Sequence, residues 1–287
     1  MIRDWTFAKI LNTGPGTSIR DLGRSGFASY GVPKSGPADL IAYSWNNLIL
    51  KNKPGAAQLE IMHPGFKVQF LAPTLISLAG PTAEIKLNKQ PIKPHGIHEI
   101  NYGDYLEIGK FELGAIIYLG IRDGFQSEEV LRSRSQYPGI TKRYFVKKSD
   151  EIPYFTNQEI PFYPKSSTVK WKTDYLHQET IRVYPGPEWN QLAKIQQKTL
   201  LTQPFHVSEM KNSMAVQLDE LIPNTLMQMA SAPVFPGTVQ LTPGGKLLCL
   251  LQDCQVTGGY PRLLQVHEED HGILVQKKPG QCIRFRQ

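Results

Sequence analysis

Apolar and polar residues alternate over short segments along most of the chain. This alternation is typical of β-strands that bury one face. Glycine, proline, asparagine or aspartate bounds the segments, as expected where turns join strands. The pattern predicts strands in the segments FKVQFL, TLISLAG, AEIKLN, DYLEIG, LGAIIYLGI, TIRVYPG, GTVQLTPGG, KLLCLLQD, RLLQVHE and CIRFR.

Helical periodicity is confined to two short segments. One helix is predicted in residues 37–50, PADLIAYSWNNLIL, and a second in residues 186–196, GPEWNQLAKIQ. The first has a proline-rich start and a broad apolar stripe. This stripe comprises Leu40, Tyr43, Trp45, Leu48 and Ile49. Many short strands with few helices are typical of a β-barrel or sandwich.

The length of 287 residues favours two domains, since it exceeds that of most single domains. Weak internal similarity also supports two domains. Residues 100–110 and residues 276–286 each combine a polar turn containing glycine with a strand. Between the halves lies a polar, proline-containing segment with little alternation until its end. We predict one β domain in residues 1–150, a linker in 151–179 and a second β domain in 180–287.

Composition narrows the function classes. Hydrophobic residues make up 40% of the chain and charged residues 20%, as is typical of globular proteins. The 22 prolines and 24 glycines therefore indicate many turns rather than disorder. The net charge is +7, but the basic residues are scattered and lack interleaved aromatic residues, so nucleic-acid binding is not indicated. The charge suits an anionic small substrate or an acidic partner.

The sequence also limits location and cysteine chemistry. Its N-terminus lacks the apolar core of a signal peptide, and no apolar run approaches the roughly 18 residues that span a bilayer. We therefore expect a cytoplasmic protein without membrane association. Three cysteines, Cys249, Cys254 and Cys282, show no CxxC spacing, which favours buried free thiols over disulfides or a thiolate metal site.

A glycine-rich stretch near the start, Thr17–Asp39, fits neither a strand nor a helix. Its glycines permit turns that expose backbone N–H groups able to hold an anion. Asp21 and Arg24 are expected to pair with each other or face a ligand, and Ser35 and Asp39 flank the step into the first helix. The alternative is a long loop held by its own Asp–Arg pairs.

A second stretch, QDCQVTGGYPR at residues 252–262, follows an apolar strand and concentrates polar groups. Burying such groups is costly unless a ligand or a hydrogen-bond network satisfies them. A tight Gly-Gly hairpin capped by Asp253 and Thr257 is the alternative. That hairpin accounts for the glycines but not readily for the remaining polar side chains, Gln252, Gln255, Tyr260 and Arg262.

A third stretch, residues 130–137, alternates arginine and serine. If it is extended, Arg132 and Arg134 project from one face and suit a carboxylate or phosphate. An exposed basic edge strand is equally compatible.

The sequence contains no GxxxxGK[ST], no GxGxxG opening a helix and no GxSxG. His267 and His271 have a spacing that suits a metal only on a helix, so no metal site is predicted.

Taken in this order, these stretches resemble the family of the C subunit of 5-oxoprolinase, also described as allophanate hydrolase subunit 2 and KipA. The family includes the carboxyltransferase domain of urea amidolyase. The resemblance covers nearly the whole chain. Its most specific motifs lie in two regions: one is TSIRDLGRSGFASYGVPKSGPAD, and the other contains PGTVQLTPGGK and then DCQVTGGYPR. It implies a mainly β fold: two tandem cyclophilin-like β-barrel domains with a few short helices.

The resemblance also implies a function. Family members work with a KipI-like B subunit and an A subunit in the ATP-dependent opening of 5-oxoproline to glutamate, with ATP bound here or by a partner subunit. Two alternatives remain. One is a non-catalytic regulator that antagonises a KipI-like inhibitor of a histidine kinase. The other is carboxyl transfer from carboxybiotin, which would need a separate biotinylated partner because no biotin attachment is expected in this chain.

Both enzymatic reactions act on an amide carbonyl, so cations and directional hydrogen bonds are needed. The resemblance implies catalytic roles for Asp253, Tyr260 and Arg262, with Asp253 as proton acceptor. The implied substrate-binding residues are Asp21, Arg24, Ser35, Asp39, Arg134, Asn212, Gln252, Gln255, Thr257, Gly258 and Gly259. The glycine-rich stretch and the Gly-Gly-Tyr stretch are thus expected to form two halves of one ligand site.

The chain departs from the family pattern at three places. Residues 211–215 read KNSMA where the family has SNRMG, so Ser213 replaces an arginine. The family's GSRST appears as RSRSQ, and its GGI as RDG at residues 122–124. An arginine lost from an anion site would weaken binding by about 1.5–3 kcal/mol if it made a charged hydrogen bond. The substrate therefore stays open.

Overall fold

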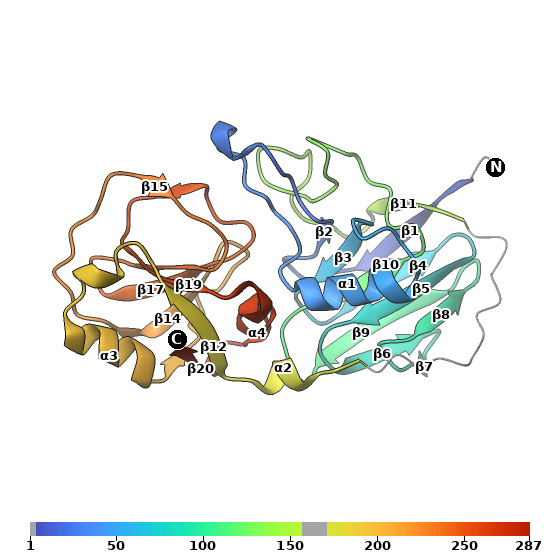
Figure 1. Cartoon of the computed structure of the whole chain (residues 1–287). Coiled ribbons are helices and arrows are strands. Elements are labelled where there is room, and N and C mark those ends of the chain that lie inside the picture. Colours follow the sequence, from blue (N-terminus) through green and yellow to red (C-terminus); the bar gives the residue numbers. More distant parts are fainter. Residues whose placement is uncertain (1–3, 157–170) are drawn as a thin grey trace. The chain divides into compact units, whose positions relative to one another are not determined.

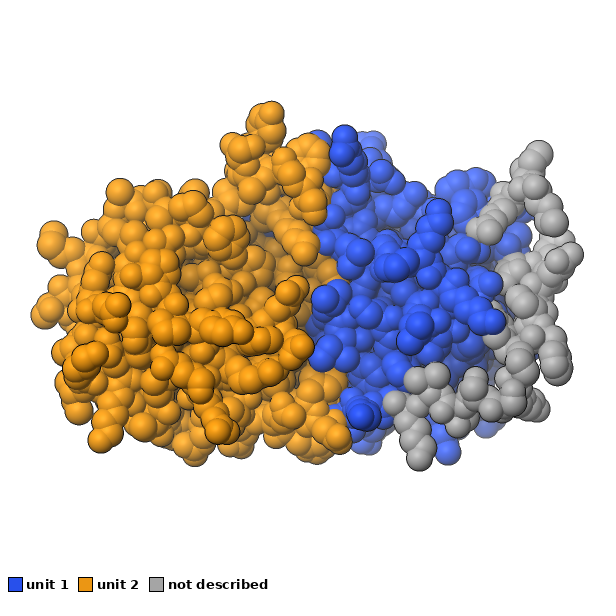
Figure 2. All heavy atoms as spheres, viewed as in Figure 1, with its two compact units in different colours: residues 1–23, 39–173 blue, residues 24–38, 174–287 orange. Residues whose placement is uncertain are grey.

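The computed structural model describes residues 4–156 and 171–287. Its strands and helices form two compact units (Figures 1 and 2). The described part of unit 1 lies within residues 1–23 and 39–173, and unit 2 comprises residues 24–38 and 174–287. The middle of the glycine-rich stretch thus belongs to unit 2, whereas both of its ends belong to unit 1.

Unit 1 contains two β-sheets whose paired strands are antiparallel. The first sheet has the order β11 (Glu151–Phe155), β1 (Trp5–Asn12), β4 (Phe66–Phe70), β9 (Tyr105–Phe111), β6 (Ala83–Leu87) and β7 (Gln90–Pro91). The second has the order β2 (Ser18–Arg20), β3 (Gln58–Ile61), β10 (Ile117–Ile121), β5 (Thr74–Ala79) and β8 (Ile97–Ile100).

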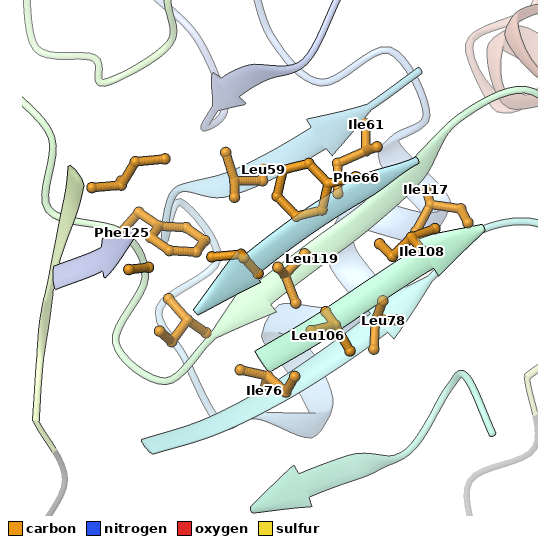
Figure 3. Packing of buried hydrophobic residues seen from close by; sticks show 14 of the residues in the cluster. Leu59, Ile61, Phe66, Ile76, Leu78, Leu106, Ile108, Ile117, Leu119 and Phe125 are labelled. Carbon is orange, nitrogen blue, oxygen red and sulfur yellow. The ribbon is translucent and has the colours of Figure 1, made fainter. Parts of the chain in front are cut away.

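The core of unit 1 consists of apolar side chains from both sheets (Figure 3). In β4, buried and half-buried residues alternate, so that Phe66, Val68 and Phe70 lie in the core. The central strands β5 and β10 are buried at every position, as expected for strands covered on both faces. This burial of apolar area is the main stabilising contribution to the unit.

Helix α1 (Leu40–Ile49) lies within residues 37–50, where a helix was predicted, and it packs against β10 and β5 of unit 1. Its N-terminus is capped by Asp39, whose carboxylate accepts hydrogen bonds from the N–H groups of Ile41 and Ala42. The predicted apolar stripe is wrong, because Leu40 and Leu48 are exposed. The buried residues of the helix are Ala42, Tyr43, Asn46 and Asn47.

Unit 2 is built around one nearly closed sheet. Its strands follow the order β13 (Phe205–His206), β20 (Cys282–Arg286), β12 (Thr180–Pro185), β19 (Arg262–Val266), β16 (Thr238–Leu241), β17 (Lys246–Leu250) and β14 (Ala215–Leu221). An isolated bridge between Val207, next to β13, and Leu218 of β14 joins the two ends of this order, so that the barrel is nearly closed. Only β12 and β20 are parallel among the paired strands described in this unit.

The remaining elements of unit 2 lie outside that sheet. They are η1 (Ala28–Tyr30), α2 (Asp174–His177), η2 (Trp189–Gln191), α3 (Lys194–Thr202), the pair β15 (Ala232–Pro233) and β18 (Thr257–Gly258), η3 (Glu268–Asp270) and α4 (His271–Gln276). The helix predicted in residues 186–196 is wrong in its bounds: this segment contains η2, and α3 begins only at Lys194. The extended backbone of Ala193, with φ −60° and ψ 149°, separates them.

The strands predicted from alternation are all present, and the predicted mainly β fold of tandem cyclophilin-like barrel domains with a few short helices is confirmed. Residues 151–155, assigned to the linker from sequence, form β11 and pair with β1. Residues 157–170 of that linker lie outside the described residues, so the domain bounds stay a prediction. None of the described helices is long and apolar enough to cross a bilayer.

Candidate functional site

Three segments of unit 2 that are distant in sequence meet beside Asp253. The Ser35 N–H donates to the Gln252 carbonyl over 3.1 Å, and the Asp253 N–H donates to the Ser213 carbonyl over 3.3 Å. The glycine-rich stretch, the KNSMA segment and the polar stretch after β17 are thereby joined. We call this group, Ser35, Ser213, Gln252 and Asp253, the Asp253 junction. Three of its members were predicted site residues.

Ser35 has two features that are costly without a compensating role. Its φ of 53° lies in the left-handed region, which a non-glycine residue rarely adopts. Its side chain is fully buried, yet the hydroxyl has no hydrogen-bond partner among the residues described. A strained backbone and an unsatisfied buried hydroxyl are features that concentrate at ligand sites.

Asp253 is only 1% exposed, so its carboxylate lies in a water-poor part of the junction. The neighbouring thiol of Cys254 is not a nucleophile, because burial and then the Asp253 charge raise its pKa to about 12. Burial likewise raises the pKa of Cys249 to about 12. The reactive group that the junction offers is therefore the carboxylate and not a thiolate.

The KNSMA segment forms a tight turn. The Asn212 side-chain oxygen accepts from the N–H groups of Met214 (2.8 Å) and Ala215 (3.0 Å), so this predicted substrate ligand shapes the turn. The Lys211 ammonium donates to the carbonyls of Val275 (2.5 Å) and Lys277 (2.7 Å) at the end of α4. Burial lowers the pKa of Lys211 to about 7. No sequence pattern indicated the partners of this lysine.

The second half of the polar stretch lies nearer the surface than Asp253 does. Gln255 and Thr257 are exposed, and Thr257 with Gly258 forms β18, paired with β15. The carbonyl of Gly259 accepts from the Met229 N–H over 3.0 Å. The carbonyl of Tyr260 accepts from the Gln240 amide over 3.1 Å.

Arg262, predicted as a catalytic cation, forms a bidentate ion pair with Glu188. Its Nε and Nη2 donate to the two carboxylate oxygens over 2.9 and 2.8 Å, and its backbone N–H donates to the same carboxylate over 2.8 Å. These hydrogen bonds hold the pKa of Glu188 below its usual range. Sequence reasoning missed Glu188, although the RVYPGPEW motif contains it. The pair links η2 to β19.

We expect Glu188→Gln to lower the free energy of unfolding at pH 7 by about 3 kcal/mol, because Arg262 loses its partner in a site only 9–17% exposed. The folded-state pKa of Glu188 is lowered, so its contribution is present above the unfolded pKa and is lost as the pH falls through the folded value. Urea unfolding at pH 7 and at pH 3 measures both. A loss that is equally large at both pH values would contradict the prediction.

Asp21, in unit 1, is surrounded by the serine-arginine stretch. Its carboxylate accepts from the hydroxyls of Ser133 (2.5 Å) and Ser135 (2.8 Å), and from the N–H groups of Arg134 (2.6 Å) and Gly23 (2.8 Å). The shared face considered for Arg132 and Arg134 required an extended stretch at residues 130–137, and the stretch is not extended throughout. A two-residue turn at Leu131 and Arg132, both with positive φ, interrupts the segment.

The Arg134 guanidinium lines a hollow of about 180 Å³ in unit 1. It donates to the Ser127 carbonyl and lies 3.9 Å from Glu129. The other basic residues of the hollow, Lys142 and Arg143, lie in ion pairs with Glu128 and Asp150, respectively.

Of the two remaining predicted residues, Arg24 begins the part of the glycine-rich stretch that belongs to unit 2, and Asp39 follows that part. Arg24 is 3% exposed, and its N–H donates to the Lys34 carbonyl over 2.7 Å. Asp39 is fully buried as the cap of α1. The predicted site residues are therefore divided: Asp21, Asp39 and Arg134 belong to unit 1 and the others to unit 2.

The described residues contain no group of three or more His, Cys, Asp or Glu side chains arranged to hold a metal ion. His267 precedes η3 and His271 follows it, so the two histidines do not share one helix. Their spacing therefore does not have the helical geometry that would suit a metal.

Comparison with known proteins identifies the family. Residues 30–287 match the family described as carboxyltransferase domain, subdomain A and B. The chain belongs to this family. The match includes the whole Asp253 junction and the C-terminal part of the glycine-rich stretch, in agreement with the resemblance seen in the sequence.

Individual relatives of the carboxyltransferase-domain chain fall into two groups. It is 28% identical to the C subunit of 5-oxoprolinase from Escherichia coli over 97% of this chain and 90% of the relative. It is 38% identical to urea amidolyase of Lachancea kluyveri, over 45% of this chain and 7% of the relative. The solved Kluyveromyces lactis urea carboxylase is 25% identical with a TM-score of 0.85, covering 99% of this chain and 27% of that one.

Proposed function

We propose that the chain is the C-type subunit of a 5-oxoprolinase, which opens 5-oxo-L-proline to L-glutamate with ATP together with A and B subunits. The similarity to known proteins supports a role of the 5-oxoprolinase type or of the urea-amidolyase type. The observation that favours the first is the match to the Escherichia coli 5-oxoprolinase chain over 97% of this chain and 90% of the relative. Because that relative is one subunit of an enzyme, a heteromeric enzyme complex is supported as well.

The Asp253 junction supplies groups suited to this reaction. Opening a lactam adds a hydroxyl to the carbonyl carbon, breaks the C–N bond and leaves a proton on the amine. In the proposal the buried Asp253 carboxylate accepts the proton of the attacking water. The Ser35 hydroxyl, which has no hydrogen-bond partner in the described part of the chain, is available to hydrogen-bond the amide. Both groups are almost completely shielded from solvent, which strengthens such interactions.

We place ATP on a partner subunit. The guanidinium of Arg262 is committed to Glu188, and that of Arg134 contacts the Ser127 carbonyl and lies near Glu129. Two of the arginines predicted to bind an anion are therefore engaged within the chain. The reaction needs a phosphate site of higher positive charge than these two side chains provide. We also propose a cytoplasmic location, supported by the three free cysteines.

Asp253→Ala is expected to abolish 5-oxoproline-dependent ATP hydrolysis and glutamate release by the chain reconstituted with its A and B subunits. We expect a loss of at least about 100-fold, as for removal of a general base. Asp219→Ala, which removes an exposed carboxylate of the same unit, serves as the matched control and should retain activity. Absence of turnover by an assembled wild-type complex would reject the proposed function.

A carboxyl-transfer function of the urea-amidolyase type is the second candidate. It is favoured by the 38% identity to the Lachancea kluyveri protein over 130 residues. Met210 and Lys211 form a Met-Lys pair, but the Lys211 ammonium is bound to two carbonyls of its own unit and is unsuited to carry biotin. Urea-dependent consumption of carboxybiotin from a separate carrier would support this function. An assembled complex inactive in both assays would favour the KipA-like regulatory alternative.

A further inference from the structure

A buried chain of polar side chains in unit 1 connects the two ends of the glycine-rich stretch. Arg20 precedes the segment that enters unit 2, and Asp39 follows it. Glu60 of β3 and Tyr118 of β10 lie between these two residues in the hydrogen-bond network. All four side chains are at most 2% exposed. We call these four residues the loop clamp.

The Glu60 carboxylate connects Arg20 to Asp39, the residues on either side of the segment that enters unit 2. The Arg20 Nε lies 3.4 Å from one oxygen of Glu60, and the Tyr118 hydroxyl donates to the other over 2.5 Å. The same hydroxyl accepts from the backbone N–H of Asp39 over 2.9 Å. Burial, followed by the charges of Glu60 and Asp39, raises the pKa of Tyr118 well above its usual range. The hydroxyl therefore keeps its one proton, and the direction of each hydrogen bond is fixed.

Such an arrangement is costly to bury unless every member is satisfied. Apolar residues would stabilise a sheet more simply, and the neighbouring positions Leu59, Ile61, Ile117 and Leu119 are indeed apolar. What the polar residues add is a fixed connection between Arg20 and the backbone of Asp39. Between these residues the chain forms the segment that carries Ser35, four positions before Asp39, to the carbonyl of Gln252.

We propose that Glu60 and Tyr118 are positioning residues, which hold the two ends of residues 24–38 and thereby keep Ser35 in its strained conformation at the Asp253 junction. The catalytic consequence of this inference rests on the proposed function, but the structural consequence does not. Loss of the clamp should increase the local opening of residues 24–38 without requiring any substrate.

The test is amide hydrogen exchange of Tyr118→Phe in the full chain, with Tyr154→Phe as the matched control. Tyr154 is also fully buried in unit 1, and its hydroxyl bonds both the carbonyl (2.7 Å) and the N–H (3.0 Å) of Ala72. The two variants therefore remove equivalent hydroxyl groups. We expect the Arg24 and Ser35 amides to exchange at least ~10-fold faster in Tyr118→Phe only. Equal rates in the two variants would overturn the inference.

Glu60→Gln is the second variant, should Tyr118→Phe fail to fold. Its amide can still accept from Tyr118 but loses the charge that faces Arg20, so an intermediate acceleration is expected. Wild-type exchange at residues 24–38 in this variant would overturn the role of the carboxylate. Faster exchange in the clamp variants upholds the inference even if the reconstituted complex proves inactive, which would reject only the proposed function.

Discussion

Gly186→Ala is expected to lower the free energy of unfolding by at least about 3 kcal/mol. Gly186 follows β12, and its N–H donates to the Leu263 carbonyl over 2.7 Å. A Cβ at this position would lie 2.2 Å from the Arg262 carbonyl oxygen and 2.8 Å from its carbon. These are backbone atoms of β19, so no side-chain rotation relieves the clash. The displacement would also separate Glu188 from Arg262.

Urea unfolding of the variant measures this loss, and Gly244→Ala is its control. Gly244 lies in the same unit, and a Cβ built there meets no atom of the described residues within 4 Å. We expect the control to change stability by less than about 0.5 kcal/mol. Equal stability of the two variants would show that β12 and β19 can separate at this point without cost, contrary to the packing observed.

The sequence predicted the strands because burial in a sheet leaves a local signal. Alternation is visible within five or six residues, and β4 and β6 show it directly in their burial. Many short strands separated by turns indicated a barrel or a sandwich, and unit 2 contains a nearly closed barrel. The bounds of helix α3 were not predictable in this way, because the preceding 3-10 turn at Trp189–Gln191 carries similar residues.

The apolar stripe of α1 failed for a physical reason. Hydrophobic patterning treats asparagine as exposed, whereas the amide of Asn46 is fully buried and donates to Gln58 (3.0 Å) and to the Tyr118 carbonyl (3.1 Å). Its oxygen accepts from the Ser77 hydroxyl over 2.7 Å. A satisfied polar side chain is tolerated in a core. Its partners come from strands far along the chain, so no local pattern contains them.

Long-range partners also explain what was missed in the candidate site. The stretches were found by their density of polar residues, but the partner of each charge was not. Arg262 pairs with Glu188, 74 positions earlier, and Asp21 bonds Ser135, 114 positions later. Sequence proximity suggested the pair Asp21 and Arg24 instead. Only the fold shows that the Asp21 carboxylate organises the serine-arginine stretch.

Asp21→Asn is accordingly expected to lower the free energy of unfolding by about 4 kcal/mol. The carboxylate accepts four hydrogen bonds while only 8% exposed. An amide is almost isosteric but replaces one acceptor oxygen with a donor. Either the Arg134 N–H or the hydroxyls of Ser133 and Ser135 would then face an N–H group. The turn at residues 131–132 would lose the contact that compensates its positive φ values.

Asp104→Asn is the matched control, because Asp104 belongs to the same unit and its carboxylate also accepts hydrogen bonds. Its donors are the Asn88 amide (2.6 Å) and the Asn101 N–H (2.7 Å), and both bonds lie at the surface. Water can replace those bonds, so we expect a loss of at most about 1 kcal/mol. Unfolding curves of the two variants, with proteolysis at residues 127–136, give the comparison. A similar small loss in both would mean that the serine hydroxyls reorient around an amide, and that the negative charge of Asp21 serves the ligand rather than the fold.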